Sequence, residues 1–263
     1  MAGPTTAERQ QKKSGPPRPQ RTRRTRLSRT RALILGLVLA ALLAAGVGWV
    51  LYGSPWLRLE SVQASGTRML TPQAVVEAAD APLGAPLISV DTDALESRLR
   101  SKLPRIDSVE AVRSWPHGIG LKVTERKPVL LIEKGEKFVE VDAEGVRFAT
   151  VEHAPKGIPR LELTPDQESG AASLRRFGTD RLLREAVRVA GDLPEAVAGD
   201  TQSVKVRSYD SISLELSHGR TVVWGSGEKG RTKATTLTAL MKAAPEARHF
   251  DVSVPTAPAS SGS

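Results

Sequence analysis

The chain of 263 residues contains no cysteine, so neither a disulfide nor a thiolate can contribute to its fold or chemistry. Its four histidines, His117, His153, His218 and His249, lie far apart and lack the close spacing of a metal site. No Ser-His-Asp set and no G-x-S-x-G motif is present. These absences predict a protein that is not an enzyme and that binds no metal or cofactor.

Charged residues are also missing from one long stretch, residues 32–52, with the sequence ALILGLVLAALLAAGVGWVLY. As a helix it would rise about 31 Å at about 1.5 Å per residue, close to the ~30 Å hydrocarbon core of a bilayer. We therefore predict a transmembrane helix, with aromatic rings at the headgroup level of its far end and Trp56 just beyond. The expected anchoring residues are Leu33, Leu35, Leu37, Leu39, Leu42, Trp49 and Tyr52.

Two other interpretations of residues 32–52 stay open. A cleaved secretory signal would use small residues such as Ala44 and Ala45 at its cleavage site. A buried helix of a soluble protein is the other possibility, but few such helices are apolar all round over this length. The long polar segment in front of the stretch favours an uncleaved anchor.

The formal net charge of +9 comes entirely from residues 1–31, which hold ten basic residues and one acidic residue. A nucleic-acid-binding tail is one interpretation, but the segment has no aromatic residue to stack on bases and no helical period. Its Pro, Gln, Gly, Thr and Ser content predicts disorder. Cations beside a span stay on the cytoplasmic side, so we expect a cytoplasmic tail and extracytoplasmic residues 53–263, with no specific nucleic-acid binding.

Residues 57–126 are predicted to form a small domain of strand, helix, helix, strand, strand. The first helix follows Thr71-Pro72, an N-cap with proline at the first helical position. Apolar alternation and helical spacing give, in order, a strand at 57–64, helices at 72–79 and 91–102, and strands at 109–115 and 119–123. We expect Trp115 to be a packed strand residue, and Glu125 and Arg126 to face opposite ways without pairing.

This order, directly after a span, resembles a POTRA domain. The stretch Arg113-Ser-Trp115-Pro116-His-Gly-Ile-Gly-Leu121-Lys-Val123-Thr-Glu125-Arg126-Lys-Pro128 resembles the hairpin and exit of the POTRA domain of the FtsQ/DivIB family of bacterial cell-division proteins. Residues from Val222-Val223-Trp224-Gly225 to Phe250-Asp251-Val252-Ser253-Val254-Pro255 resemble the β-domain of the same family. The fold class implied is α+β: a single transmembrane helix, a POTRA domain at 57–126 and a mostly antiparallel β-domain with flanking helices at 127–254.

The elements expected after Pro128 follow from alternation, turn residues and helical spacing. Strands are predicted at 129–132, 138–141, 146–149, 159–163, 204–206, 212–216, 221–224 and 250–254, and helices at about 182–191 and 229–244. Residues 164–178 are ambiguous, and 255–263 are expected to be a flexible tail. Glu140, Asp142 and Glu144 are expected to be solvated acids of one hairpin.

Gly225, Gly227 and Gly230 match the G-x-G-x-x-G fingerprint of dinucleotide sites. The same stretch differs from a P-loop motif at one position, where Arg231 replaces the lysine. The unit stands alone at the C-terminal end, after an expected antiparallel meander, in a domain expected outside the cell, where such nucleotides are scarce. We therefore interpret the motif as a glycine-rich strand exit into a helix, with nucleotide binding as the alternative.

The family resemblance implies a non-catalytic bitopic scaffold of the divisome, concentrated at the division septum. The implied partners are bitopic division proteins of the FtsB and FtsL type and the proteins of septal peptidoglycan synthesis. The main alternative is another POTRA-bearing membrane protein that binds polypeptides; an envelope enzyme is a third.

The resemblance places the FtsB contact near the last strand, so Phe250, Asp251, Val252, Ser253 and Val254 are the expected partner-binding residues. An exposed edge strand offers unpaired backbone groups to which a partner segment can add. The alternative is that both edges of this strand are already paired inside the sheet. Pro255 and Pro258 depart from a longer extended C-terminus, which would shorten the contact or shift it onto the preceding helix.

Overall fold

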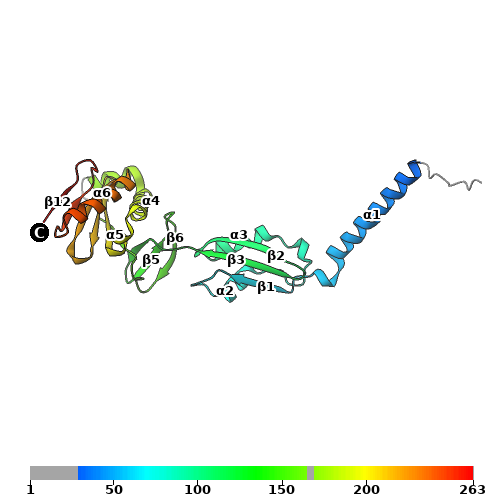
Figure 1. Cartoon of the computed structure of the whole chain (residues 1–263). Helices are drawn as coiled ribbons and strands as arrows, with labels where there is room; N and C mark the ends of the chain where they lie inside the picture. The colour runs from blue at the N-terminus through cyan, green and yellow to red at the C-terminus, as the bar shows by residue number, and fades with distance from the viewer. Residues whose placement is uncertain (1–28, 165–168, 263) are drawn as a thin grey trace, which may run out of the picture. The chain divides into compact units, whose positions relative to one another are not determined.

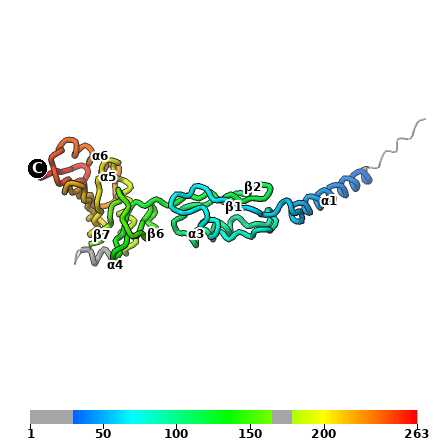
Figure 2. Tube along the Cα trace, turned by 90° about the horizontal axis from the view of Figure 1, so that it is seen from below, coloured from blue at the N-terminus to red at the C-terminus, as the bar shows by residue number. Residues whose placement is uncertain are grey.

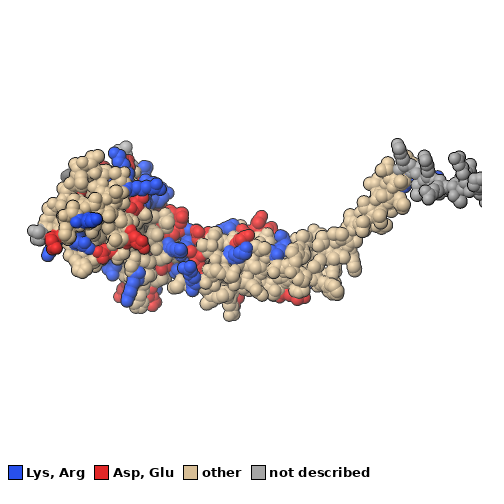
Figure 3. Space-filling model, in the orientation of Figure 1, with Lys and Arg blue, Asp and Glu red and all other residues tan. Residues whose placement is uncertain are grey.

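The structure is a computed structural model that describes residues 29–164 and 169–262, and it divides into two compact units, 1–53 and 54–263. In the first unit, helix α1 (Arg29–Gly53) contains one stretch, Thr30–Gly53, that is long and apolar enough to cross a membrane. All seven expected anchoring side chains are exposed along it, from Leu33 to Tyr52. Figure 3 shows a surface free of charge over most of this helix. The predicted basic tail lies almost wholly outside the described residues.

The second unit begins with a three-stranded sheet and two helices (Figure 1). In chain order its elements are η1 (Pro55–Leu57), β1 (Ser61–Ser65), α2 (Pro72–Ala79), η2 (Leu87–Ser89), α3 (Thr92–Lys102), β2 (Ile106–Ser114) and β3 (Gly118–Glu125). The strand order is β1-β3-β2, parallel for β1 with β3 and antiparallel for β2 with β3. This confirms the predicted POTRA-like element order.

The N-caps predict where both helices of this sheet begin. Thr71 Oγ1 accepts a hydrogen bond from Ala74 N at 3.1 Å, and Asp91 Oδ1 accepts one from Ala94 N at 3.0 Å. Leu95 and Leu99, four residues apart, are both buried against the sheet.

Two local expectations in this region are wrong. The first strand starts at Ser61 rather than at residue 57, because the Ser54 side chain caps a turn of 3₁₀ helix at Pro55–Leu57. Trp115 is not packed: β2 ends at Ser114, so Trp115 lies in the turn before β3 and its side chain is 49% exposed. The following Trp115–Pro116 peptide bond is cis.

The remaining elements form a nine-stranded mixed sheet with helices packed on it. They are β4 (Leu130–Lys134), β5 (Lys137–Val141), β6 (Arg147–Val151), β7 (Arg160–Leu163), α4 (Ser169–Asp192), α5 (Glu195–Asp200), β8 (Thr201–Ser208), β9 (Ser211–Leu216), η3 (Ser217–Gly219), β10 (Thr221–Gly225), α6 (Gly230–Ala243), β11 (His249–Asp251) and β12 (Ala259–Ser261). The strand order is β12-β11-β10-β9-β8-β7-β4-β5-β6. Parallel pairs occur at β4–β7, β7–β8 and β10–β11, and the others are antiparallel, which confirms an α+β fold.

Each sheet has its own hydrophobic core. In the larger one, Leu182, Leu183 and Ala186 of α4 and Leu237 of α6 pack with Trp224 of β10, all of them at most 2% exposed. Figure 2, in which colour follows the chain, shows the residues from β4 onward gathered apart from β1 to β3. The segment from the end of β3 at Glu125 to the start of β4 at Leu130 connects the smaller sheet to the larger one.

The C-terminal end differs from the expectation. Instead of one strand at 250–254, β11 spans His249–Asp251, and the chain then turns and returns as β12. The Asp251 side chain stabilises the turn by accepting hydrogen bonds from Ser253 N at 2.9 Å and Ser253 Oγ at 2.7 Å. Residues 259–261, expected in a flexible tail, are therefore part of the sheet.

Candidate partner-binding edge and domain junction

The strand expected to offer a free edge is paired on both sides. β11 runs parallel to β10, with Val222 opposite Phe250, and antiparallel to β12, with Phe250 opposite Ser260. The alternative, that both edges are occupied, is therefore the correct description of β11. The sequence did not predict this pairing because β12 consists of one alanine and two serines, small residues that give no alternating pattern.

The five expected partner-binding residues fall into two groups. Phe250 is 1% exposed and Val252 is fully buried, so their side chains belong to the core of the larger sheet. Asp251 and Ser253 are half-buried, and Val254 is 55% exposed in the turn. The side chains still open to a partner are thus those of the turn.

The open edge of the sheet at this end is β12. Its three residues are exposed, and within the described residues no strand pairs with its outer side. Arg248 N donates to Ser261 O at 3.2 Å, which places that carbonyl on the β11 side. Because backbone groups of successive strand residues point to opposite sides, the N–H and C=O of Ser260 face outward. Beside this edge lies a shallow cavity of ≈ 270 Å³ lined by Ala244, Pro245, Glu246, Ala247, Ser261 and Gly262.

The glycine motif lies in a β10–α6–β11 unit with parallel strands, as the fingerprint requires, but the loop is closed. A Cβ on Gly227 would lie 2.3 Å from Glu185 Oε2, and one on Gly230 would lie 1.9 Å from Asp192 Oδ2. The Glu185 carboxylate thus lies against the second glycine of the motif, where the fingerprint brings a pyrophosphate close to the backbone, and the Asp192 contact shows close packing at the third. This geometry supports the interpretation of a strand exit.

Lys233, which lies behind this loop, also has a structural role. Lys233 is 2% exposed, and its Nζ donates to Trp224 O and Ser226 O, both at 2.8 Å. Burial lowers the pKa of Lys233, with nearby Glu228 and Asp251 opposing the shift. The cation therefore holds the chain as it leaves β10 and does not face a ligand.

An ion-pair network that the sequence did not predict joins the two sheets of residues 54–263. Arg126 Nη1 contacts Asp142 Oδ2, which lies in the turn between β5 and β6. The same nitrogen lies 3.3 Å from Asp107 Oδ1 in β2 and 3.8 Å from Glu144 Oε2. Asp142 is only 2% exposed, and its other oxygen accepts hydrogen bonds from the backbone of the same turn. Asp142 is thus a buried junction residue, contrary to the expected solvated acid.

A second pair lies beside it. Arg105 Nη2 donates to Glu140 Oε2 at 2.6 Å, and the Arg105 guanidinium lies 5.2 Å from the centre of the Phe148 ring. Glu140 is 3% exposed, so the expectation of a solvated acid is wrong here too; only Glu144 is exposed. As expected, Glu125 and Arg126 do not pair with each other, but each belongs to a network of its own.

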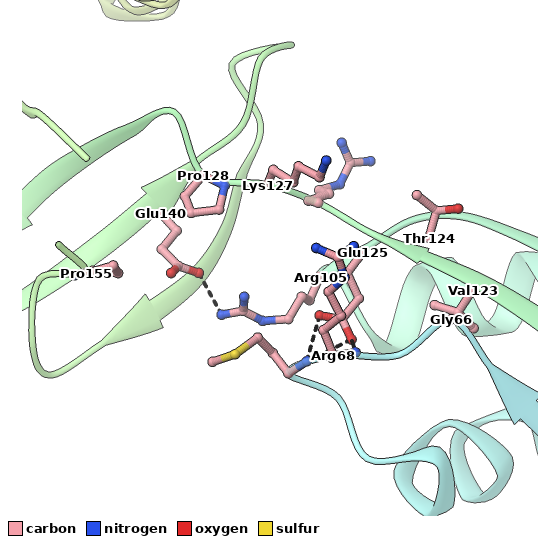
Figure 4. Close-up of a pocket in the computed structure, with 12 residues that line it drawn as sticks. Gly66, Arg68, Arg105, Val123, Thr124, Glu125, Lys127, Pro128, Glu140 and Pro155 are labelled. Atoms are coloured by element: carbon pink, nitrogen blue, oxygen red, sulfur yellow. Dashed lines mark hydrogen bonds and ion pairs between the residues drawn. The ribbon is translucent and has the colours of Figure 1, made fainter. Parts of the chain in front are cut away.

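A cavity of ≈ 510 Å³ opens where these networks meet (Figure 4). Its lining includes Arg105, Glu125, Arg126, Pro128 and Glu140. Figure 4 shows Arg105 reaching Glu140, while Glu125 turns toward the backbone at Arg68. The ion pairs in this lining can hold the two sheets together.

The Glu125 side chain binds the backbone of the loop between β1 and α2. Its carboxylate accepts hydrogen bonds from Arg68 N at 2.6 Å, Met69 N at 3.0 Å and Leu70 N at 3.0 Å. Burial raises the pKa of the Glu125 carboxyl. The three N–H donors and the charge of Arg105 together outweigh burial and bring this pKa below its ordinary value.

We expect Glu125→Gln to remove an acid-sensitive part of the stability. Because the folded pKa of Glu125 is lowered, its contribution is complete above the ordinary carboxyl pKa and is lost as the pH falls through the folded pKa. Urea midpoints of the full chain, followed by circular dichroism, should be lower in the variant at pH 7 and should converge with the wild type in acid. Parallel curves at all pH values would contradict this role.

Among the described residues no group of three His, Asp or Glu side chains is placed to hold a metal ion. The arrangement as a whole is that of an α+β protein with one helix fit to span a membrane, followed by a POTRA-like domain and a mixed-sheet domain.

Comparison with known proteins identifies the family. A model described as "POTRA domain, FtsQ-type" matches residues 57–126, and one described as "Cell division protein FtsQ/DivIB, C-terminal" matches residues 130–254. The chain is 70% identical over 267 residues to the cell division protein FtsQ of Streptomyces collinus and 68% identical to that of Streptomyces coelicolor, with 100% of each chain covered in both cases. The chain belongs to the FtsQ/DivIB family of cell division proteins.

One solved structure is similar at lower identity. It is the major extracytoplasmic domain of the trans isomer of the cell division protein DivIB from Geobacillus stearothermophilus. It shares 16% sequence identity with a TM-score of 0.32, over 51% of this chain and 97% of that one. Family membership rests on the sequence matches, and it gives this protein a role in cell division and in the protein–protein interactions of the divisome.

Proposed function

We propose that this protein is a non-catalytic scaffold of the divisome that links other division proteins to septal peptidoglycan synthesis. Residues 57–126 and 127–254 act as its POTRA domain and β-domain, and the basic tail keeps the N-terminus cytoplasmic and both domains outside. Its partners are bitopic proteins of the FtsB and FtsL type and proteins of septal peptidoglycan synthesis. Family membership supports the division role.

The observation that carries the proposal is the open edge at β12. Backbone N–H and C=O groups of Ser260 face outward there, and the adjoining turn exposes Val254. An extended segment of a partner adds to this edge as a further strand, with backbone pairing providing affinity. The proposed contact is thus displaced from Phe250 to Val254 toward the turn and β12.

The function is tested by location in the cell. A fluorescent protein fused to the cytoplasmic tail is expected to concentrate at division septa, because a divisome scaffold accumulates where its partners assemble. A uniform membrane signal from a fusion that supports growth of a depleted strain would contradict the scaffold role. A fusion truncated before residue 54 is the control, since it keeps the span but lacks both domains.

The partner edge is tested by Ser260→Pro. Proline lacks the outward donor but leaves the inward bonds of Ala259 and Ser261 to β11, so the fold should persist. We expect binding of an FtsB-type segment to the full chain, measured by titration calorimetry, to weaken about tenfold, the effect of one lost hydrogen bond of ~1.4 kcal/mol. Ser260→Ala keeps the N–H group and should bind as the wild type does. Equal affinity of both variants would remove β12 from the contact.

A further inference from the structure

Two exposed tryptophans lie at one end of the three-stranded sheet. Trp56 of η1 is 81% exposed, and Trp115 of the β2–β3 turn is 49% exposed. The two are far apart in the sequence, yet the fold joins the segments that carry them. His117 Nδ1 lies 3.4 Å from Trp56 O, and the His117 carbonyl accepts a hydrogen bond from Glu60 N at 2.9 Å.

Both segments are held by the fold. The Ser54 hydroxyl oxygen accepts a hydrogen bond from Trp56 N at 3.2 Å and fixes the start of η1. At the end of β2, the Arg113 guanidinium donates to Leu87 O at 3.2 Å and to Val90 O at 2.6 Å. The tryptophans therefore lie on segments that hydrogen bonds tie to the domain, where large exposed apolar rings indicate a contact surface.

Chain length brings this end to the membrane. Trp56 follows Gly53, the last residue of the helix that is fit to span a bilayer, by three residues. Three extended residues reach at most about 11 Å, so Trp56 stays near the headgroup layer in any arrangement of the two units. Tryptophan favours this layer because its ring is apolar and its N–H group needs a polar partner.

We propose that Trp56 and Trp115 dock this end of the domain on the phospholipid headgroup layer of the membrane that the chain spans. The inference rests on α1 as a span. The charged side chains nearest Trp56 in the sequence, Arg58 and Glu60, are of opposite sign, and Arg58 is bound to Gly84 O at 2.7 Å. The contact is thus one of aromatic rings with lipid and needs no anionic lipid. It sets the height and tilt of the POTRA domain above the bilayer.

The test must measure whether Trp115 contacts lipid, because the covalent chain alone would bring Trp56 to the lipid. The full chain with Trp49→Phe and Trp56→Phe, reconstituted in vesicles of brominated phosphatidylcholine, keeps Trp115 and the buried Trp224. We expect bromine to quench part of the emission, and we expect that part to vanish when Trp115→Phe is added. Trp224, fully buried, should remain unquenched and should report an intact fold.

A matched tryptophan at the other end of the domain is the control. Met69 is 72% exposed, and its N–H is bound to Glu125 at the end of β3, whereas Trp115 precedes the start of β3. The eight residues of β3 separate the two ends by about 26 Å. In the background with Trp49, Trp56 and Trp115 all replaced by Phe, Met69→Trp should be quenched by aqueous iodide and not by brominated lipid.

Brominated-lipid quenching of Trp115 that exceeds that of a tryptophan at position 69 supports the docking. Equal quenching at both positions, quenching of Trp115 by iodide alone, or protection of Trp115 from both quenchers would each overturn it, the last by showing that protein covers this end.

Discussion

Arg126→Ala is expected to lower the free energy of unfolding of residues 54–263 by about 3–5 kcal/mol. The side chains of Arg126 and Asp142 are 18% and 3% exposed, and removing one partner of a buried pair leaves the other charge uncompensated. Urea unfolding of the full chain in detergent, followed by the emission of buried Trp224, measures the change. Lys122→Ala is the control: its pair with Glu110 at 3.4 Å is exposed on both sides and should contribute less than about 1 kcal/mol.

The double variant Arg126→Ala/Asp142→Ala shows whether the pair carries this effect. If it does, the double variant should lose much less than the sum of the single losses, because each single change already breaks the same contact. Additive losses would mean that the two residues act separately, for instance through Asp107 and the hydrogen bonds of the β5–β6 turn. In that case Arg126 would not be the link between the two sheets.

Phe250→Ala is expected to lower the free energy of unfolding by about 3–5 kcal/mol, because its ring is 1% exposed in the core of the larger sheet and its removal leaves a cavity. Val254→Ala, in the exposed turn four residues later, should change stability by less than about 0.5 kcal/mol. Thermal or urea unfolding of the two full-length variants compares them directly.

This comparison also bears on the partner site. Loss of partner binding in Phe250→Ala should follow its loss of folded protein, whereas Val254→Ala should remain folded and should affect binding only through the contact itself. A Phe250→Ala protein with unchanged stability but lost binding would contradict the assignment of this ring to the core. It would instead return Phe250 to the partner surface.

The sequence by itself determined the elements whose causes are local. The uncharged run before Gly53 is long enough to span a bilayer by composition alone. Thr71 and Asp91 cap helices that follow them directly, and the spacing of Leu95 and Leu99 fixes the buried face of α3. The family was recognisable from the stretch around Trp115 and Pro128 because that pattern, too, consists of residues close together in the sequence.

Only the tertiary structure decided what depends on distant partners. Glu140 and Asp142 have the sequence features of solvated turn acids. Arg105 and Arg126, which come from the other sheet, offset the cost of burying these two carboxylates. Strand β12 has no pattern of its own and exists because β11 offers it an edge. The segments that carry Trp56 and Trp115 come together at one end of a domain through the pairing of β1 with β3, which are far apart in the chain. Such contacts depend on the closure of long loops, and no local spacing of residues records them.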